Sequence, residues 1–168
     1  NGADLAQSAQ KRENAVTVPN AVMMIEHYNR LVRMVQSHVP VTLEVNIDAK
    51  FTGDHEHGYN TVAEIAGTDP KLKDQVVMVG GHLDSWISGT GATDNGTGVS
   101  TTLEAARILM KSGVKPKRTI RFMLWSGEEQ GLLGSRAYIK AHPELMPKIS
   151  AVLVHDGGTN YLSGILST

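Results

Sequence analysis

The sequence contains no cysteine, so disulfide bonds and thiolate metal sites are both excluded. Any metal must therefore be held by His, Asp and Glu side chains. No apolar run approaches the roughly 20 residues that a membrane-spanning helix needs. The N-terminal residues also lack the basic and then apolar order of a signal peptide. We therefore expect a soluble piece of a mature or cut protein, without a membrane span.

Neither sign of charge dominates the chain. Its formal net charge is −1, its pI is about 6.7, and like charges form no run anywhere. A protein that binds a phosphate backbone or an anionic membrane surface needs a basic face. The composition therefore excludes nucleic acid as an expected partner. At 168 residues, with 40% hydrophobic and 20% charged residues, the chain is long enough for one domain with a sizeable core.

Strand-like and helix-like segments alternate through the second half of the sequence. The apolar run 76–79 is typical of a strand buried on both faces, and the helical pattern of 96–112 stops at Gly113, the usual place for glycine. The full order is strands at 76–79, 119–125 and 149–154 with helices at 96–112 and 132–141 between them. This order predicts an α/β fold with parallel strands in a sheet that helices cover on both faces.

The first third of the chain gives weaker signals. Residues 1–16 are polar and show no clear period. After Pro19, apolar residues recur every three or four positions and predict an amphipathic helix that lies on a core. Residues 41–47 alternate between apolar and polar, which predicts a strand with one buried face, and 60–66 predicts another strand.

Acidic and histidine residues follow the three buried strands. They are His82 and Asp84 after the first strand, Asp94 in the glycine-rich loop, Glu128 and Glu129 after the second strand, and Asp156 after the third. The carboxyl ends of parallel strands meet at one crevice, so these residues are expected to converge there.

A convergence of carboxylates calls for a cation, because carboxylates that share a crevice repel one another. Zinc accepts imidazole nitrogen and carboxylate oxygen, and a pair of zinc ions can activate water at neutral pH. A ligating imidazole generally donates its other N–H to a carboxylate, and the carboxylate of Asp84 is placed to receive it from His82. Of Glu128 and Glu129, one can bind metal while the other carries a proton.

Each of these residues alone has a simpler interpretation. A single Asp or His at the end of a strand is most often a helix cap or a turn residue. The glycine-rich loop at 89–98 could be a phosphate-binding turn, but it has neither the dinucleotide fingerprint nor the lysine of a P-loop. The conjunction of all these residues is what favours a metal site.

Four motifs, in this order and spacing, carry a resemblance to a known family: GGHLDSW, ATDNGTG, LWSGEEQGLLGS and VHDGG. They resemble the co-catalytic zinc exopeptidases, the family that includes bacterial leucyl aminopeptidase and plasma glutamate carboxypeptidase. The likeness covers about residues 59–158, and HLDSW and PKRT resemble the latter branch most. It implies a three-layer α/β sandwich with a mixed, mostly parallel sheet.

The resemblance also implies roles for single residues. His82 and Asp156 would hold one zinc, Asp94 would bridge two, and Glu129 would hold the other. The implied reaction is hydrolysis of short peptides or dipeptides through a metal-bridged hydroxide, with Glu128 as the general base. Asp84 would be the partner that orients His82, and Asp94–Asn95 would be a cis peptide bond.

Relatives have one further histidine ligand downstream, which this chain does not reach, so one zinc or none is expected to bind. The resemblance divides the chain into 1–48, the end of a protease-associated domain, and 49–168, a partial catalytic domain. It also implies a secreted or periplasmic location. Two alternatives stay open: a non-catalytic, receptor-like binding module of the same fold, and a glutaminyl cyclase with a single zinc. The other histidines are expected to be solvated or structural.

Overall fold

The computed structural model describes residues 21–48, 50, 57–86 and 89–159. The chain divides into two units, Asn1–Glu56 and His57–Thr168. The polar residues 1–16 lie outside the described part. Within the described part, no helix has the length and apolar character that crossing a lipid bilayer requires.

The first unit contains one described helix, α2 (Ile25–Gln36), as the apolar period predicts. No residue of α2 is buried, and Ile25 and Tyr28 on its predicted apolar stripe are 67% and 58% exposed. Residues 41–48 form no strand, so that prediction is wrong. Alternation shows which face of a strand could be buried, but a strand also needs a hydrogen-bonded neighbour, and the described residues of this unit provide none.

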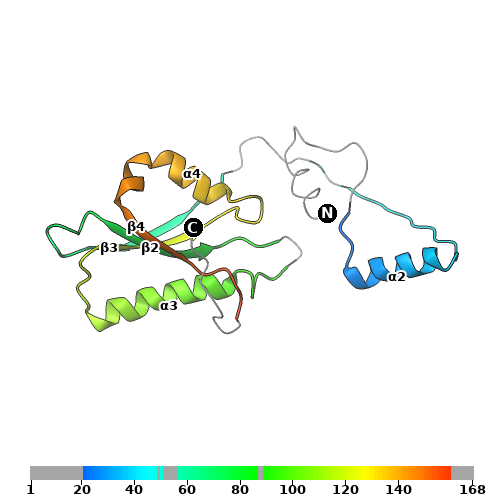
Figure 1. Ribbon diagram of the computed structural model, residues 1–168, viewed down its shortest axis with the longest axis horizontal. Coiled ribbons are helices and arrows are strands. Elements are labelled where there is room, and N and C mark those ends of the chain that lie inside the picture. The colour runs from blue at the N-terminus through cyan, green and yellow to red at the C-terminus, as the bar shows by residue number, and fades with distance from the viewer. Residues whose placement is uncertain (1–20, 49, 51–56, 87–88, 160–168) are drawn as a thin grey trace. The chain divides into compact units, whose positions relative to one another are not determined.

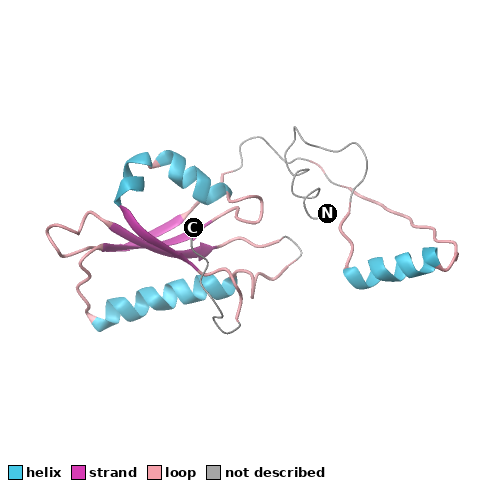
Figure 2. Ribbon diagram, in the orientation of Figure 1, coloured by secondary structure: helices cyan, strands magenta, loops and turns pink. Residues whose placement is uncertain are grey.

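The second unit is built on a four-stranded sheet in the order β1-β3-β2-β4. Figure 2 shows this sheet in magenta, with helices beside it. The strands are β1 (Thr61–Ile65), β2 (Val76–His82), β3 (Thr119–Trp125) and β4 (Ile149–Val154). β2 pairs in parallel with both β3 and β4, while β1 pairs antiparallel with β3. The sheet is therefore mixed and mostly parallel, as predicted. β2 continues three residues beyond the predicted run, so His82 is its last residue rather than a loop residue.

Helices lie on both faces of this sheet, with α3 on one side and α4 on the other (Figure 1). Helix α3 (Gly96–Ser112) begins after Asn95, whose side chain accepts the N–H of Gly98, and it ends at Gly113 in the left-handed conformation. Helix α4 (Leu133–Ala141) continues into the short 3₁₀ helix η2 (Pro143–Lys148), which leads to β4. The predicted three-layer α/β fold is confirmed.

The core lies where β2 and β3 run side by side. Its buried apolar residues are Val76, Met78, Phe122, Met123 and Leu124. β4 pairs with β2 along one edge, and its apolar side chains stay open to solvent, with Val154 57% exposed. The two central strands therefore form the best-packed part of the unit, and β2 carries His82 at its end.

Replacing Met123 by Ala tests this assignment of the core. Met123 is completely buried, so its truncation should lower the free energy of unfolding by about 2–5 kcal/mol. Met110, on α3, is 66% exposed, and Met110→Ala is the matched control with an expected change within about 0.5 kcal/mol. Urea unfolding followed by circular dichroism measures both, and equal effects of the two variants would refute the assignment.

Candidate metal centre

His82 is the buried centre of the site. It ends β2 opposite Trp125 of β3 and is 2% exposed. Its Nδ1 lies 2.9 Å from the carbonyl oxygen of Asp84. A carbonyl oxygen can only accept, so Nδ1 carries the proton and donates it. Nε2 of the neutral ring is then left with a lone pair that can bind a metal ion.

Two carboxylates lie against that nitrogen. The distance from His82 Nε2 to Asp94 Oδ1 is 2.9 Å, and to Asp156 Oδ1 it is 3.1 Å. A lone pair facing two carboxylate oxygens is repulsive, so this arrangement requires a cation, either a proton on Nε2 or a metal ion. One ligand atom from each residue lies within 4.8 Å of the other two, the only such group among the described residues. One imidazole with two carboxylates is a donor set that suits zinc.

The carboxylate of Asp84 binds the backbone of Glu128 and Glu129 instead of the ring of His82, which the sequence predicted as its partner. This carboxylate accepts the backbone N–H of Glu128 at 3.0 Å and that of Glu129 at 3.2 Å. The same carboxylate is 3.6 Å from His82 Nδ1, so the hydrogen-bond partner of His82 is the carbonyl of Asp84 and not its side chain. Asp84 thus joins His82, at the end of β2, to the turn that carries Glu128 and Glu129. Sequence reasoning missed its contacts with the two amides, although aspartate is a common acceptor for turn amides.

The two glutamates occupy different positions. Glu128 Oε2 is 4.0 Å from His82 Nε2, near the three-residue group, and its side chain is 31% exposed. Glu129 is 9% exposed and is not a member of that group. The structure therefore brings His82, Asp94 and Asp156 together, with Glu128 beside them and Glu129 held in the same turn.

Burial and charge shift the ionisation of the site. Burial raises the pKa of Glu128, and the charges of Asp156, Asp84 and Asp94 add to the rise. The pKa of Glu129 is raised by burial and by the charge of Asp94. Burial acts to lower the pKa of His82, but the charge of Asp156 and the hydrogen bonds with Asp84 and Asp156 outweigh it, so that pKa is raised too. All three groups hold protons more tightly than usual when no metal is present.

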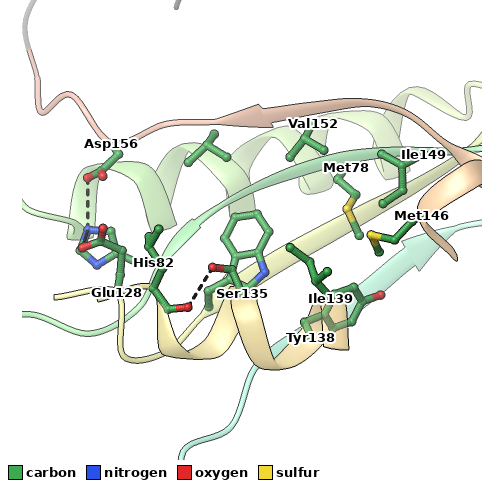
Figure 3. A pocket seen from close by; sticks show the side chains of 13 residues that line it. Met78, His82, Glu128, Ser135, Tyr138, Ile139, Met146, Ile149, Val152 and Asp156 are labelled. Atoms are coloured by element: carbon green, nitrogen blue, oxygen red, sulfur yellow. Dashed lines mark hydrogen bonds and ion pairs between the residues drawn. The ribbon is translucent and has the colours of Figure 1, made fainter. Parts of the chain in front are cut away.

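A hollow of about 330 Å³ lies beside the site, between α4 and the sheet. Figure 3 shows His82, Glu128 and Asp156 at one end of it and apolar side chains such as Met78, Met146 and Val152 at the other. The hollow therefore has a charged end at the site and an apolar end away from it.

The fold and this donor group together define a class: an α/β domain with a candidate metal site at the carboxyl ends of its parallel strands. A family model, Peptidase family M28, matches residues 60–167, and the chain belongs to this family. The family resemblance seen in the sequence is thereby confirmed. The peptide bond between Asp94 and Asn95 is cis, as the resemblance implied.

Individual relatives agree with this assignment. The chain is 37% identical to human carboxypeptidase Q over 151 residues, which cover 90% of the chain and 31% of that protein. A crystal structure of a peptidase M28 precursor from Shewanella amazonensis superimposes with a TM-score of 0.56 and 43% identity, covering 60% of this chain and 22% of that one. A zinc aminopeptidase from Bacillus subtilis gives a TM-score of 0.52 and 32% identity over 58% and 23% of the two chains. The chain therefore spans about a third of the length of human carboxypeptidase Q.

The raised pKa values predict how the metal-free protein responds to pH. A group whose pKa is higher in the folded state stabilises the fold below its unfolded pKa, and this contribution is lost as the pH rises through the folded pKa. Glu128, Glu129 and His82 all act in this direction, from ordinary values of 4.5 and 6.5. In the presence of a chelator, the free energy of unfolding should therefore fall between about pH 5 and pH 8.

Urea unfolding at several pH values measures this slope. The double variant with Glu128→Gln and Glu129→Gln should show a flatter slope, because two of the three groups no longer titrate. Saturating zinc should reverse the trend, since metal binding competes with protons. A metal-free stability that rises over this interval would contradict the electrostatic description of the site.

Proposed function

We propose that this chain is the part of a zinc-dependent exopeptidase that holds its metal site. The single observation that carries the proposal is the approach of Asp94 and Asp156 to Nε2 of buried His82, at 2.9 and 3.1 Å. Membership of Peptidase family M28 supports hydrolysis of a peptide bond as the reaction. A bound metal ion gives a physical reason for placing two carboxylates against one imidazole nitrogen.

The donor set indicates which residues would hold zinc. His82 and Asp156 are proposed as ligands of one ion, Asp94 as the bridge between two, and Glu129 as a ligand of the second. A bound zinc ion would lower the pKa of a water molecule and polarise the scissile carbonyl. Asp94 suits a bridge because its side chain is 65% exposed while one oxygen points at His82, so its other side stays accessible.

Glu128 is proposed as the general base. It lies beside the ligand group without being part of it, and its raised pKa brings it nearer to the pH at which it must both accept and release a proton. It would take a proton from the attacking water and later deliver one to the leaving amine. The bonds between Asp84 and the two glutamate amides would hold Glu128 in this position.

The substrate, location and domain arrangement are also proposals, because the chain covers only part of its relatives. Short peptides or dipeptides are the proposed substrates, in line with names such as aminopeptidase and carboxypeptidase among the relatives. A secreted or periplasmic location and a division at residues 48 and 49 stay predictions from the resemblance.

Replacing Glu128 by Gln tests the general base. In the intact protein, peptide turnover should fall by about 10²–10⁴, because the amide cannot accept a proton, while zinc content stays nearly unchanged. Glu104→Gln is the control, since Glu104 is an exposed residue of α3 paired with Arg107. Amino-acid amide hydrolysis and atomic emission measure the two quantities, and parallel loss of zinc and activity would refute the division of roles.

Zinc content tests the proposed ligands separately from activity. In the intact protein, Glu129→Gln should remove about one zinc per chain, and Asp94→Asn should weaken both because a bridging ligand serves both ions. Zinc per chain is measured after dialysis against a weak chelator. If Glu129→Gln retains the zinc content of the unmodified protein, Glu129 is not a ligand.

A further inference from the structure

Asn95 connects two segments that are far apart in the sequence. It is 2% exposed, and its side-chain Oδ1 accepts the N–H of Gly98 at 3.0 Å, in the first turn of α3. Its Nδ2 donates to the carbonyl of His155 at 2.9 Å, just after β4. One buried amide group therefore ties the glycine-rich loop to the exit of β4, across 60 residues of sequence.

The surrounding glycines leave little space beside this connection. A Cβ atom at Gly98 would lie 2.2 Å from the carbonyl oxygen of His155 and 2.5 Å from Asn95 Oδ1. A Cβ atom at Gly81, in β2, would lie 3.1 Å from Asn95 Nδ2 and 3.2 Å from the same carbonyl. The backbone of His155 also donates to the carbonyl of Gly80 at 3.0 Å. The loop, β2 and the exit of β4 are thus packed backbone against backbone at this point.

The two ends of the connection are next to two proposed zinc ligands. Asp94 directly precedes Asn95, and Asp156 directly follows His155. We propose that Asn95 is a positioning residue, whose amide fixes the separation of Asp94 and Asp156 so that both reach the same side of His82. This inference rests on the proposed function for its purpose, while the connection itself can be tested without metal.

A helix cap is the simpler role for Asn95, and it explains only half of the geometry. An N-cap needs a side-chain oxygen for an amide of the first turn, which the contact with Gly98 already provides. Serine is an equally good N-cap, but its side chain is shorter than the amide, so a hydroxyl that accepts from Gly98 does not extend to the carbonyl of His155. Asn95→Ser therefore retains the cap and removes the connection, while Asn95→Ala removes both.

The experiment compares Asn95→Ser, Asn95→Ala and the control Thr97→Val in the intact protein. Thr97 donates to the carbonyl of Thr93 at 2.7 Å, a bond within the same loop that does not reach β4. Residues that hold metal ligands in place typically change metal affinity by about 10–100-fold. We expect both Asn95 variants to bind zinc that much more weakly, with an altered visible spectrum after cobalt substitution, while Thr97→Val stays close to the unmodified protein.

The comparison separates positioning from capping. If Asn95→Ser matches Thr97→Val in zinc affinity and cobalt spectrum, and only Asn95→Ala differs, then Asn95 is merely a cap and the proposal is overturned. A lower melting temperature without a change in cobalt spectrum also overturns it, because a purely structural role would alter stability alone.

Hydrogen exchange on the unmodified, metal-free protein gives an independent test that needs no variant. If the connection holds, the amides of residues 95–98 and 155–158 should open together, with the same dependence on denaturant. Independent opening of the two segments overturns the proposal, even if the Asn95 variants fail to fold. If the unmodified protein binds no zinc, the proposed function fails, and this exchange result still decides whether Asn95 joins the two segments.

Discussion

The site depends on one electrostatic constraint: a buried imidazole nitrogen has two carboxylate oxygens against it, and only a cation between them makes the arrangement favourable. Nδ1 of His82 already donates to a carbonyl, so Nε2 must meet Asp94 and Asp156 either as a protonated ring or as a metal ligand. In the metal-free protein, the charge of Asp156 and the hydrogen bonds with Asp84 and Asp156 raise the pKa of His82 and so favour the first option. A bound metal ion would take the place of that proton, and one imidazole with two carboxylates is a donor set that suits zinc.

The sheet supplies the geometry that makes this constraint possible. β2 lies between β3 and β4, so the exit of β2 has a parallel neighbour on each side. His82 comes from the central strand, Asp156 from one neighbour, and the turn with Glu128 from the other. Asp84, two residues beyond β2, accepts the amides of Glu128 and Glu129, so the turn with the two glutamates is held by the segment that follows the histidine.

Much of this arrangement could be predicted from the sequence. Strands buried on both faces appear as continuous apolar runs, and the polar residues that follow parallel strands must lie at the same edge of the sheet. β3, β4 and α3 lie at the predicted residues for this reason. The prediction of a strand at 41–47 was wrong because alternation of apolar and polar residues does not show whether a partner strand exists. The acceptor of His82 was assigned to the wrong atom of Asp84, since spacing along a strand cannot distinguish a carbonyl from a carboxylate. The contact between Asn95 and His155 joins residues 60 positions apart, so no local pattern reveals it.

The position of the glutamates shows how one short motif can serve two purposes. Successive residues of a turn share a backbone anchor but point in different directions, so Glu128 lies beside the ligand group and Glu129 is more deeply buried. Both pKa values are raised, with burial as the leading cause. A cation bound by Glu129 would favour the charged form of that residue. Under the proposed roles, two adjacent glutamates held by one aspartate thus divide into a metal ligand and a proton carrier.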